Sequence, residues 1–251
     1  MAVLDGPESG QRVVHLHIFK NAGTSVDRFF FDLLGARRCL EVEDPDHQRF
    51  TFSEDDLRQE ISRNPDILYF TSHKFFLPQD LKGLLPIILL RHPLIRVLSC
   101  FHFEKNIQRV LPEGETLQTY VERRLKQRRF NAIVGRQLAT VAGANMQGNW
   151  TKSSLNEANL AYAKARVAAC STIGTIDHLE TIIQTILEQA ALEDRSATKQ
   201  AFPRENAHLG LSSVDEAQQT LRARLSAETY ADLVQQLAFE VDLFDFASNQ
   251  P

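Results

Sequence analysis

Residues 12–35 constrain the fold of this chain more than any other segment, because they read as a strand, a short loop and a helix. Apolar β-forming residues fill the first part of the segment, and apolar residues recur at helical spacing in the second part until Gly35. The loop between them, residues 20–25, has the sequence Lys-Asn-Ala-Gly-Thr-Ser. Its glycine lets the backbone turn or approach a ligand closely, and its two hydroxyls can cap a helix. Because a helix N-terminus exposes unpaired N–H groups and Lys20 adds a full charge, we interpret this loop as an anion-binding site.

The usual nucleotide-binding motifs do not fit this loop. It has no Gly-x-Gly-x-x-Gly pattern, and Thr24 follows Gly23 where a Walker motif has lysine. A turn and helix cap without any ligand is therefore the alternative interpretation. The lysine inside the loop, however, would place its ammonium near the middle of a bound anion rather than at the outer phosphates.

Two later strands are expected to end beside this loop. Residues 67–71 read as a strand that leads to His73, and the continuous apolar run 86–90 is typical of a buried parallel strand, here followed by Arg91. In parallel α/β sheets, ligands bind at the carboxyl ends of the strands. His73 is thus a candidate general base, because imidazole titrates near neutral pH, and Arg91 is a candidate phosphate ligand. A structural histidine and a salt-bridged surface arginine are the alternatives.

The rest of the chain shows a mostly helical pattern. Ser53 begins one short helix, Pro93 begins another, and Ser213 opens a capping box before the last helix. Further helices are expected over 117–130, 131–141, 155–169 and 178–189. We expect a strand and turn over 171–177 and loops over 37–52, 143–152 and 202–210. A final helix is expected with one apolar face that consists of Tyr230, Leu233, Val234 and Leu237. No linker divides the chain, so we expect a single domain over 1–251 with a flexible N-terminus over 1–11.

Composition and charge exclude several classes of partner. The hydrophobic fraction of 43% is ample for a core, while a net charge of −4 and a pI of about 6.1 give no overall attraction to nucleic acid or acidic lipid. No apolar run reaches the roughly 18–20 residues that span a bilayer, and Met1–Gly10 has no signal-peptide core. The 3 cysteines are widely spaced, which predicts reduced thiols and no metal site. We therefore expect a soluble, cytoplasmic protein.

Two segments resemble motifs of one enzyme family. His17–Ser25, with the sequence HIFKNAGTS, is similar to the 5′-phosphosulfate loop of the sulfotransferases that use 3′-phosphoadenosine 5′-phosphosulfate (PAPS), in the branch with the heparan and chondroitin sulfotransferases. Leu90–Ser99, with the sequence LRHPLIRVLS, resembles the 3′-phosphate motif of that family. Phe19 stands where the family usually has proline, and His92 stands where it usually has aspartate. Residues 72–76 show a weaker similarity to the segment that carries the family's catalytic histidine.

The resemblance implies a fold, a reaction and a set of site residues. The fold is a P-loop-like, three-layer α/β domain with a central, mostly parallel β-sheet flanked by helices and a helix-rich C-terminal half. The reaction is transfer of the sulfuryl group from PAPS to an acceptor hydroxyl, most readily on a carbohydrate, with no metal required. Lys20 would stabilise the leaving group, and His73 would deprotonate the acceptor. The residues that would bind PAPS are Lys20, Asn21, Ala22, Gly23, Thr24, Ser25, Arg91 and Ser99. Golgi relatives in that family carry a membrane anchor. Since this sequence shows no apolar run long enough for such an anchor, the resemblance implies a cytoplasmic, bacterial member.

Other functions are also compatible with the sequence. They are a P-loop-like ATP-dependent kinase, a catalytically silent nucleotide-binding module and a helical scaffold without a ligand. A kinase would need a lysine after Gly23 and a magnesium-binding acid at a second strand end, where this chain has Arg91. The basic cluster 123–129 is interpreted as a solvated helix face, with docking of an acidic acceptor as the alternative. Trp150 is a candidate platform for sugar stacking.

Overall fold

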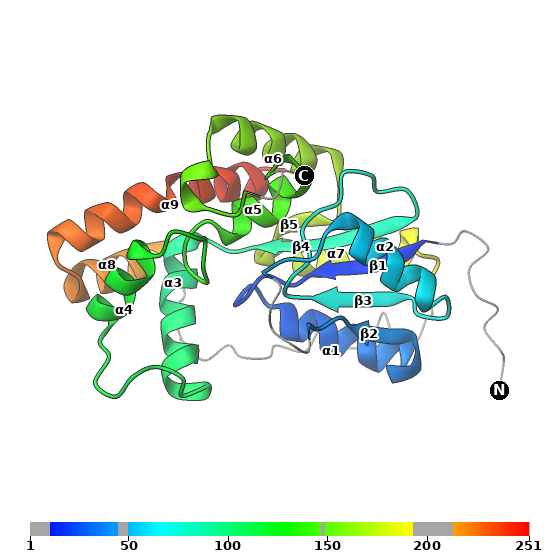
Figure 1. The fold of residues 1–251 in the computed structure, drawn as a ribbon, viewed down its shortest axis with the longest axis horizontal. Helices are drawn as coiled ribbons and strands as arrows, with labels where there is room; N and C mark the ends of the chain where they lie inside the picture. Colours follow the sequence, from blue (N-terminus) through cyan, green and yellow to red (C-terminus); the bar gives the residue numbers. More distant parts are fainter. Residues whose placement is uncertain (1–10, 45–49, 147–148, 193–212, 251) are drawn as a thin grey trace.

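Five parallel strands form the centre of the structure, a computed structural model that describes residues 11–44, 50–146, 149–192 and 213–250. The strands are β1 (Arg12–Leu16), β2 (Cys39–Glu41), β3 (Tyr69–Ser72), β4 (Leu84–Leu90) and β5 (Ile173–Thr175). They lie in the order β2-β3-β1-β4-β5, and every pair of neighbours is parallel. The carboxyl ends of all five therefore share one edge of the sheet (Figure 1). The predicted mostly parallel sheet is confirmed.

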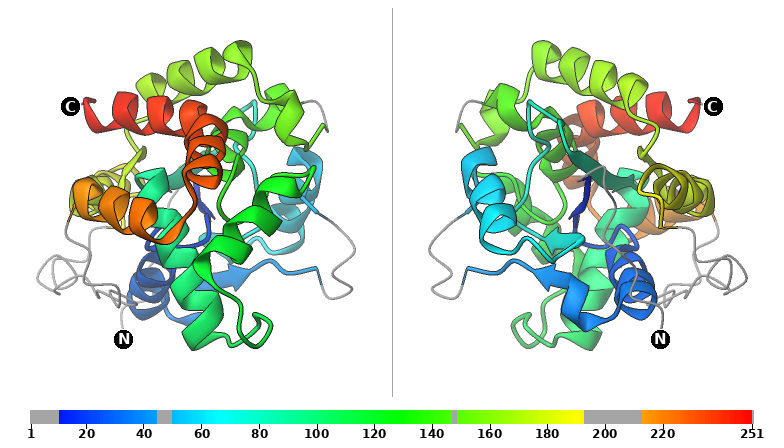
Figure 2. Two further views of the ribbon diagram at one scale, coloured as in Figure 1. Left: turned by 90° about the vertical axis from the view of Figure 1, so that its left-hand side faces the viewer. Right: turned by 90° about the vertical axis from the view of Figure 1, so that its right-hand side faces the viewer.

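Helices cover both faces of the sheet and so produce three layers. Successive strand residues point to opposite faces, so that Val13 and Ile87 pack on one side while Val14 and Ile88 pack on the other. The first face is covered by α1 (Gly23–Leu34) and α7 (Leu179–Gln189). The second face is covered by α2 (Glu54–Arg63), α5 (Arg136–Ala142), α6 (Glu157–Ala169) and α9 (Ala227–Ser248). Figures 1 and 2 show α6 and α9 on one side of the sheet and α1 on the other.

A second apolar core lies beyond the carboxyl edge of the sheet, between helices of the helix-rich half. The helices are α3 (Pro93–His102), α4 (Leu117–Lys126), α8 (Val214–Arg224) and the first half of α9. Leu98, Tyr120, Leu221 and Leu237 are among the buried residues that join them. No helix in the described parts of the chain is long and apolar enough to cross a membrane.

The helix that follows β1 starts differently from the prediction. α1 begins at Gly23, and its N-cap residue is Ala22, which has a left-handed backbone (φ 61°) and makes no side-chain capping bond. Thr24 and Ser25 lie inside the first turn, so the prediction that their hydroxyls cap the helix is wrong. The physical reason is the tight turn at Ala22, which brings the helix start two residues closer to β1.

Three other expectations need correction. The segment 37–52, expected to be irregular, contains the edge strand β2, whose three residues are too few for a sequence signal. α5 begins at Arg136 and not at Asn131, because the Asn131 side chain accepts from the backbone N–H groups of Ile133 and Val134 and holds a turn. Val234 was expected on the apolar face of the final helix, but it is 41% exposed. The predicted loop 202–210 lies outside the described residues.

Several helix-boundary signals are confirmed. Ser53 caps α2 in a reciprocal capping box with Asp56, and Pro93 occupies the first position of α3. Gly35 ends α1 with a positive φ of 76°, and its N–H donates to the carbonyl of Phe31. The N-terminal residues 1–10, predicted to be flexible, lie outside the described chain.

Candidate active site

The two motifs that resemble donor-binding segments meet at the carboxyl edge of the sheet. β1 and β4 are neighbours, so the loop after β1 and the start of α3 lie side by side. The Arg91 guanidinium joins them, because its Nη1 donates both to the carbonyl of Lys20 (3.1 Å) and to Oγ of Ser99 (3.1 Å). One arginine thus touches both predicted anion-binding segments.

Lys20 and Arg91 lie close together without acidic partners. Neither side chain forms an ion pair with any carboxylate of the described residues. Burial, together with the charge of Arg91, lowers the pKa of Lys20, and burial also lowers the pKa of Arg91. Lys20 and Arg91 are thus two cations near the N-terminus of α1 that form no ion pair within the described residues, an arrangement compatible with the predicted anion site.

The start of α1 fits this interpretation. Position 23 needs a glycine, because the Cβ atom of any other residue would lie 2.1 Å from the imidazole of His17. The backbone of the first turn can therefore lie directly against that ring. Thr24 is exposed at this turn, whereas Ser25 is buried. The predicted loop residues Lys20 and Ala22 both have left-handed backbones, which orients the loop around the helix start.

A glutamine that the sequence did not reveal holds the two motifs in place. Gln137 on α5 accepts from Asn21 Nδ2 (2.7 Å) and from the backbone N–H of Arg91 (2.8 Å), and its own Nε2 donates to the Arg91 carbonyl (3.0 Å). Asn21 also donates to the carbonyl of Leu89 (2.7 Å) and is 1% exposed. The Asn21 amide nitrogen therefore binds protein, while its Oδ1 has no partner in the described chain. No motif marks Gln137, since its role depends on a contact across 116 residues.

Gln137 is in turn fixed by a fully buried ion pair. Glu240 of α9 accepts from Arg96 of α3 (3.2 Å) and from the backbone N–H groups of Gly135 (2.8 Å) and Gln137 (2.6 Å). Arg96 also donates to the carbonyl of Ala132. The second arginine of the 3′-phosphate-like motif thus points into the protein, as expected for a structural residue.

His73, the candidate base, follows β3 at the same edge. Its Nδ1 donates to the carbonyl oxygen of His17 (3.0 Å), which leaves Nε2 as the unprotonated nitrogen. Its ring packs on that of His17 with centroids 3.8 Å apart, and the residue remains exposed. Surrounding protein atoms and the neighbouring His17 lower the pKa of His73, so it is neutral at pH 7. Nε2 is therefore unprotonated at pH 7, and a pKa of about 3 also makes it a weaker proton acceptor than an ordinary imidazole.

A hydrogen-bonded cluster lies beneath His73. Asp27 of α1 accepts from Nδ1 of His15 (2.7 Å), from Nδ1 of His17 (2.9 Å) and from the Tyr69 hydroxyl (2.6 Å). Burial alone would raise the pKa of Asp27, but the two histidine hydrogen bonds outweigh it and hold that pKa far below its usual range. Ligand atoms of Asp27 and the two histidines lie within 4.8 Å of one another, a spacing that a metal ion can also use. The hydrogen bonds account for the arrangement.

His92 has a structural role that explains its place in the motif. It is the N-cap of α3, and its Nδ1 accepts from the N–H of Leu94 (3.3 Å). Aspartate, which the resembled family usually has here, is a preferred residue for the same task. Burial lowers the pKa of His92, which keeps the imidazole neutral and able to accept. Histidine therefore substitutes for aspartate as a cap.

Comparison with known families agrees with this geometry. A model described as "Sulfotransferase family" matches residues 8–247, nearly the whole chain. The chain belongs to the sulfotransferase family. No curated protein matches this sulfotransferase closely enough to serve as a relative.

Two other features considered for the acceptor of this sulfotransferase, Trp150 and the basic cluster 123–129, make contacts within the protein. Trp150 lies against Phe76 (4.2 Å between centroids) and edge-on to Phe130, and it is partly buried. Within the basic cluster 123–129, Arg124 forms a partly buried ion pair with Glu104. That cluster is therefore only in part a solvated helix face.

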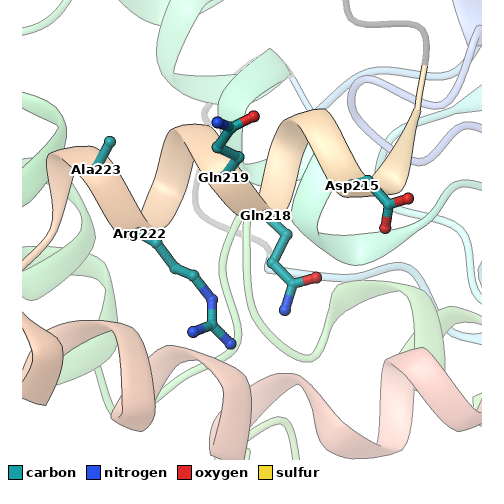
Figure 3. A pocket seen from close by; sticks show the side chains of 5 residues that line it. All are labelled: Asp215, Gln218, Gln219, Arg222 and Ala223. Atoms are coloured by element: carbon teal, nitrogen blue, oxygen red, sulfur yellow. The ribbon is translucent and has the colours of Figure 1, made fainter.

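A surface hollow on α8 lies apart from this site. Its lining comes from one helix, namely Asp215, Gln218, Gln219, Arg222 and Ala223 (Figure 3). Figure 3 shows Gln218 and Arg222 extending to one side of the helix and Gln219 to the other. None of these residues belongs to the segments after β1, β3 or β4, so we assign the hollow no part in sulfuryl transfer.

Proposed function

We propose that this sulfotransferase transfers the sulfuryl group of PAPS to an acceptor hydroxyl at the edge formed by β1, β3 and β4. The observation that carries the proposal is the Arg91 guanidinium, which contacts the Lys20 backbone and the Ser99 hydroxyl together. PAPS has anionic groups at its 5′ and 3′ ends, and two adjacent cations without carboxylate partners among the described residues suit such a ligand.

The donor supplies the sulfuryl group and a nucleotide leaving group. The backbone N–H groups at Gly23 and Thr24, with the hydroxyls of Thr24 and Ser25, would bind the 5′-phosphate end. Arg91 and Ser99 would bind the 3′-phosphate. Asn21 and Ala22 would contribute by shaping the loop, since the Asn21 amide donates to protein groups.

Lys20 and His73 would perform the chemistry. Nε2 of His73 would accept the proton of the acceptor hydroxyl while the hydroxyl oxygen bonds to sulfur and the sulfur–oxygen bond to the nucleotide breaks. The Lys20 ammonium would stabilise the negative charge that develops on the departing oxygen, by analogy with phosphoryl transfer. A carbohydrate hydroxyl is the acceptor that the family resemblance favours.

Four variants test this assignment. Lys20→Ala should reduce kcat far more than affinity for the bisphosphate product, Arg91→Ala should chiefly reduce that affinity, and His73→Ala should lower the rate by roughly 10²–10⁴-fold. Lys82→Ala removes an exposed lysine at a distance from the site and serves as the control. Binding is measured by calorimetry with the bisphosphate nucleotide, and transfer by labelled sulfate from PAPS to a carbohydrate pool.

The same measurements separate the rival functions. Stabilisation by ATP with magnesium and not by the bisphosphate nucleotide would indicate a kinase, whereas nucleotide binding without transfer to carbohydrate, lipid or phenolic pools would indicate a silent binding module. Equal and small effects of Lys20→Ala and Arg91→Ala would contradict the proposed roles.

A further inference from the structure

The Lys20 side chain has one close partner in the described structure, and that partner is an aromatic ring. Nζ of Lys20 lies 4.0 Å from the centroid of the Phe103 ring. At this distance an ammonium interacts favourably with the negative face of the ring. The contact is notable because burial and the Arg91 guanidinium both disfavour the charged form of Lys20.

Phe103 is held in place by an unusual local structure. It opens a π-helical turn, Phe103–Ile107, that directly continues α3. Single π-helical turns inside or after α-helices occur often at functional sites. The next residue, Glu104, anchors this turn, because its buried carboxylate accepts from Arg124 (2.5 Å) and from the hydroxyl of Tyr120 (3.0 Å).

A residue of the Lys20 loop also contacts the Phe103 ring. Phe19 meets it edge to face, with centroids 5.5 Å apart and planes at 75°. Phe19 is the residue that replaces the proline usual in the resembled motif. This chain therefore has an aromatic pair next to Lys20, whereas a proline at position 19 would offer no aromatic ring. Lys20 has a left-handed backbone (φ 67°), which sets the direction in which its side chain leaves the loop.

We propose that Phe103 is a positioning residue for Lys20. The face of the Phe103 ring keeps the Lys20 ammonium charged and aimed at the donor site during sulfuryl transfer. The inference rests on the proposed function for its catalytic meaning. The contact between the two side chains stands independently of it. The charged and titratable groups that act on Lys20 from the neighbouring elements are Arg91, which precedes α3, and Cys100, within α3.

The experiment compares Phe103→Leu, which removes the ring face, with Phe103→Tyr, which keeps it. The reactivity of each lysine toward an amine-specific acylating reagent is measured from pH 6 to 11 by mass spectrometry. In Phe103→Leu, the Lys20 profile should move to lower pH, with roughly a 3- to 10-fold faster reaction at pH 8. Phe103→Tyr should restore the wild-type profile. Lys82, which is exposed and remote, serves as the internal control and should react identically in all three proteins.

Activity gives the second readout. Phe103→Leu should lower kcat for sulfuryl transfer by a similar factor with little change in the KM for PAPS, and Phe103→Tyr should recover it. An unmoved Lys20 profile in Phe103→Leu, or a tyrosine variant that behaves like the leucine variant, would overturn the inference. If the profile moves as expected but the wild-type protein transfers no sulfuryl group, the proposed function fails while the positioning role of Phe103 stands.

Discussion

Replacing Glu240 by glutamine tests the physical basis of the site most directly. The Glu240 carboxylate is 1% exposed, and it accepts hydrogen bonds from Arg96 and from two backbone N–H groups, those of Gly135 and Gln137. Glutamine has nearly the same shape, but it lacks the charge and replaces one acceptor oxygen with a donor. The Arg96 guanidinium, which is 0% exposed, would then be a buried charge without compensation.

The expected cost is large for a single isosteric change. Breaking a buried ion pair on one side typically destabilises a protein by about 3–5 kcal/mol. If the urea m-value is about 3 kcal/mol/M, Glu240→Gln should lower the midpoint of urea unfolding by roughly 1 M or more. The double variant Arg96→Met/Glu240→Gln should recover part of that loss, because it removes the unpaired buried charge while the remaining glutamine oxygen can still accept from a backbone N–H group.

The assay is equilibrium urea unfolding followed by circular dichroism, combined with bisphosphate nucleotide binding below the transition. Glu228→Gln, on the exposed first turn of α9, is the matched control and should cost less than about 1 kcal/mol. Folded Glu240→Gln should also bind nucleotide more weakly, because Gln137 loses its support. A midpoint within the range of the control, or unchanged nucleotide affinity, would refute the reasoning.

Three further variants have defined outcomes. Gly23→Ala should destabilise the protein by about 1–3 kcal/mol by displacing the His17 ring, and His17→Ala in the same chain should relieve that strain, as a double-mutant cycle of unfolding free energies would show. His92→Ala should cost about 1 kcal/mol at pH 8. Because burial lowers the folded-state pKa of His92 below its unfolded value, that cost should shrink as the pH falls below about 6.5, which unfolding at pH 8 and pH 5 measures. Ser53→Ala should cost about 1 kcal/mol through loss of the α2 cap, whereas Ser62→Ala on the same helix should cost little; equal midpoints would contradict the capping role.

The sequence predicted the elements whose signals are local. The run around β4 is buried on both faces and therefore apolar throughout, and the caps at Ser53 and Gly35 need only neighbouring residues. The edge strand β2 gave no signal, because three residues are too few to show a usable periodicity. The start of α1 was misplaced because the left-handed turn at Ala22 is a property of the assembled loop and not of alanine.

The site was predictable in its motifs but not in its supports. Lys20, Arg91 and His73 follow strand signals, so their common edge could be inferred from the parallel sheet. Gln137 and Glu240 could not be inferred, since each acts through contacts more than 100 residues away and neither lies in a recognisable pattern. The capping role of His92 needed the coordinates as well, because only its Nδ1 contact distinguishes a cap from a titrating site residue.

The supports explain how Lys20 and Arg91 are held at one edge of the sheet. Burial, and also the charge of Arg91, lowers the pKa of Lys20, while the Arg91 guanidinium itself donates to the Lys20 carbonyl and so links the two loops. Gln137 binds Asn21 and both backbone polar groups of Arg91, and the Glu240–Arg96 pair binds Gln137 to the far helices. The helix-rich half of the chain thus holds the loop after β1 and the start of α3 in one arrangement, in which the proposed donor site is already assembled. If a ligand with two anionic groups binds there as proposed, it should stabilise the folded protein further, because it would bind only the folded state.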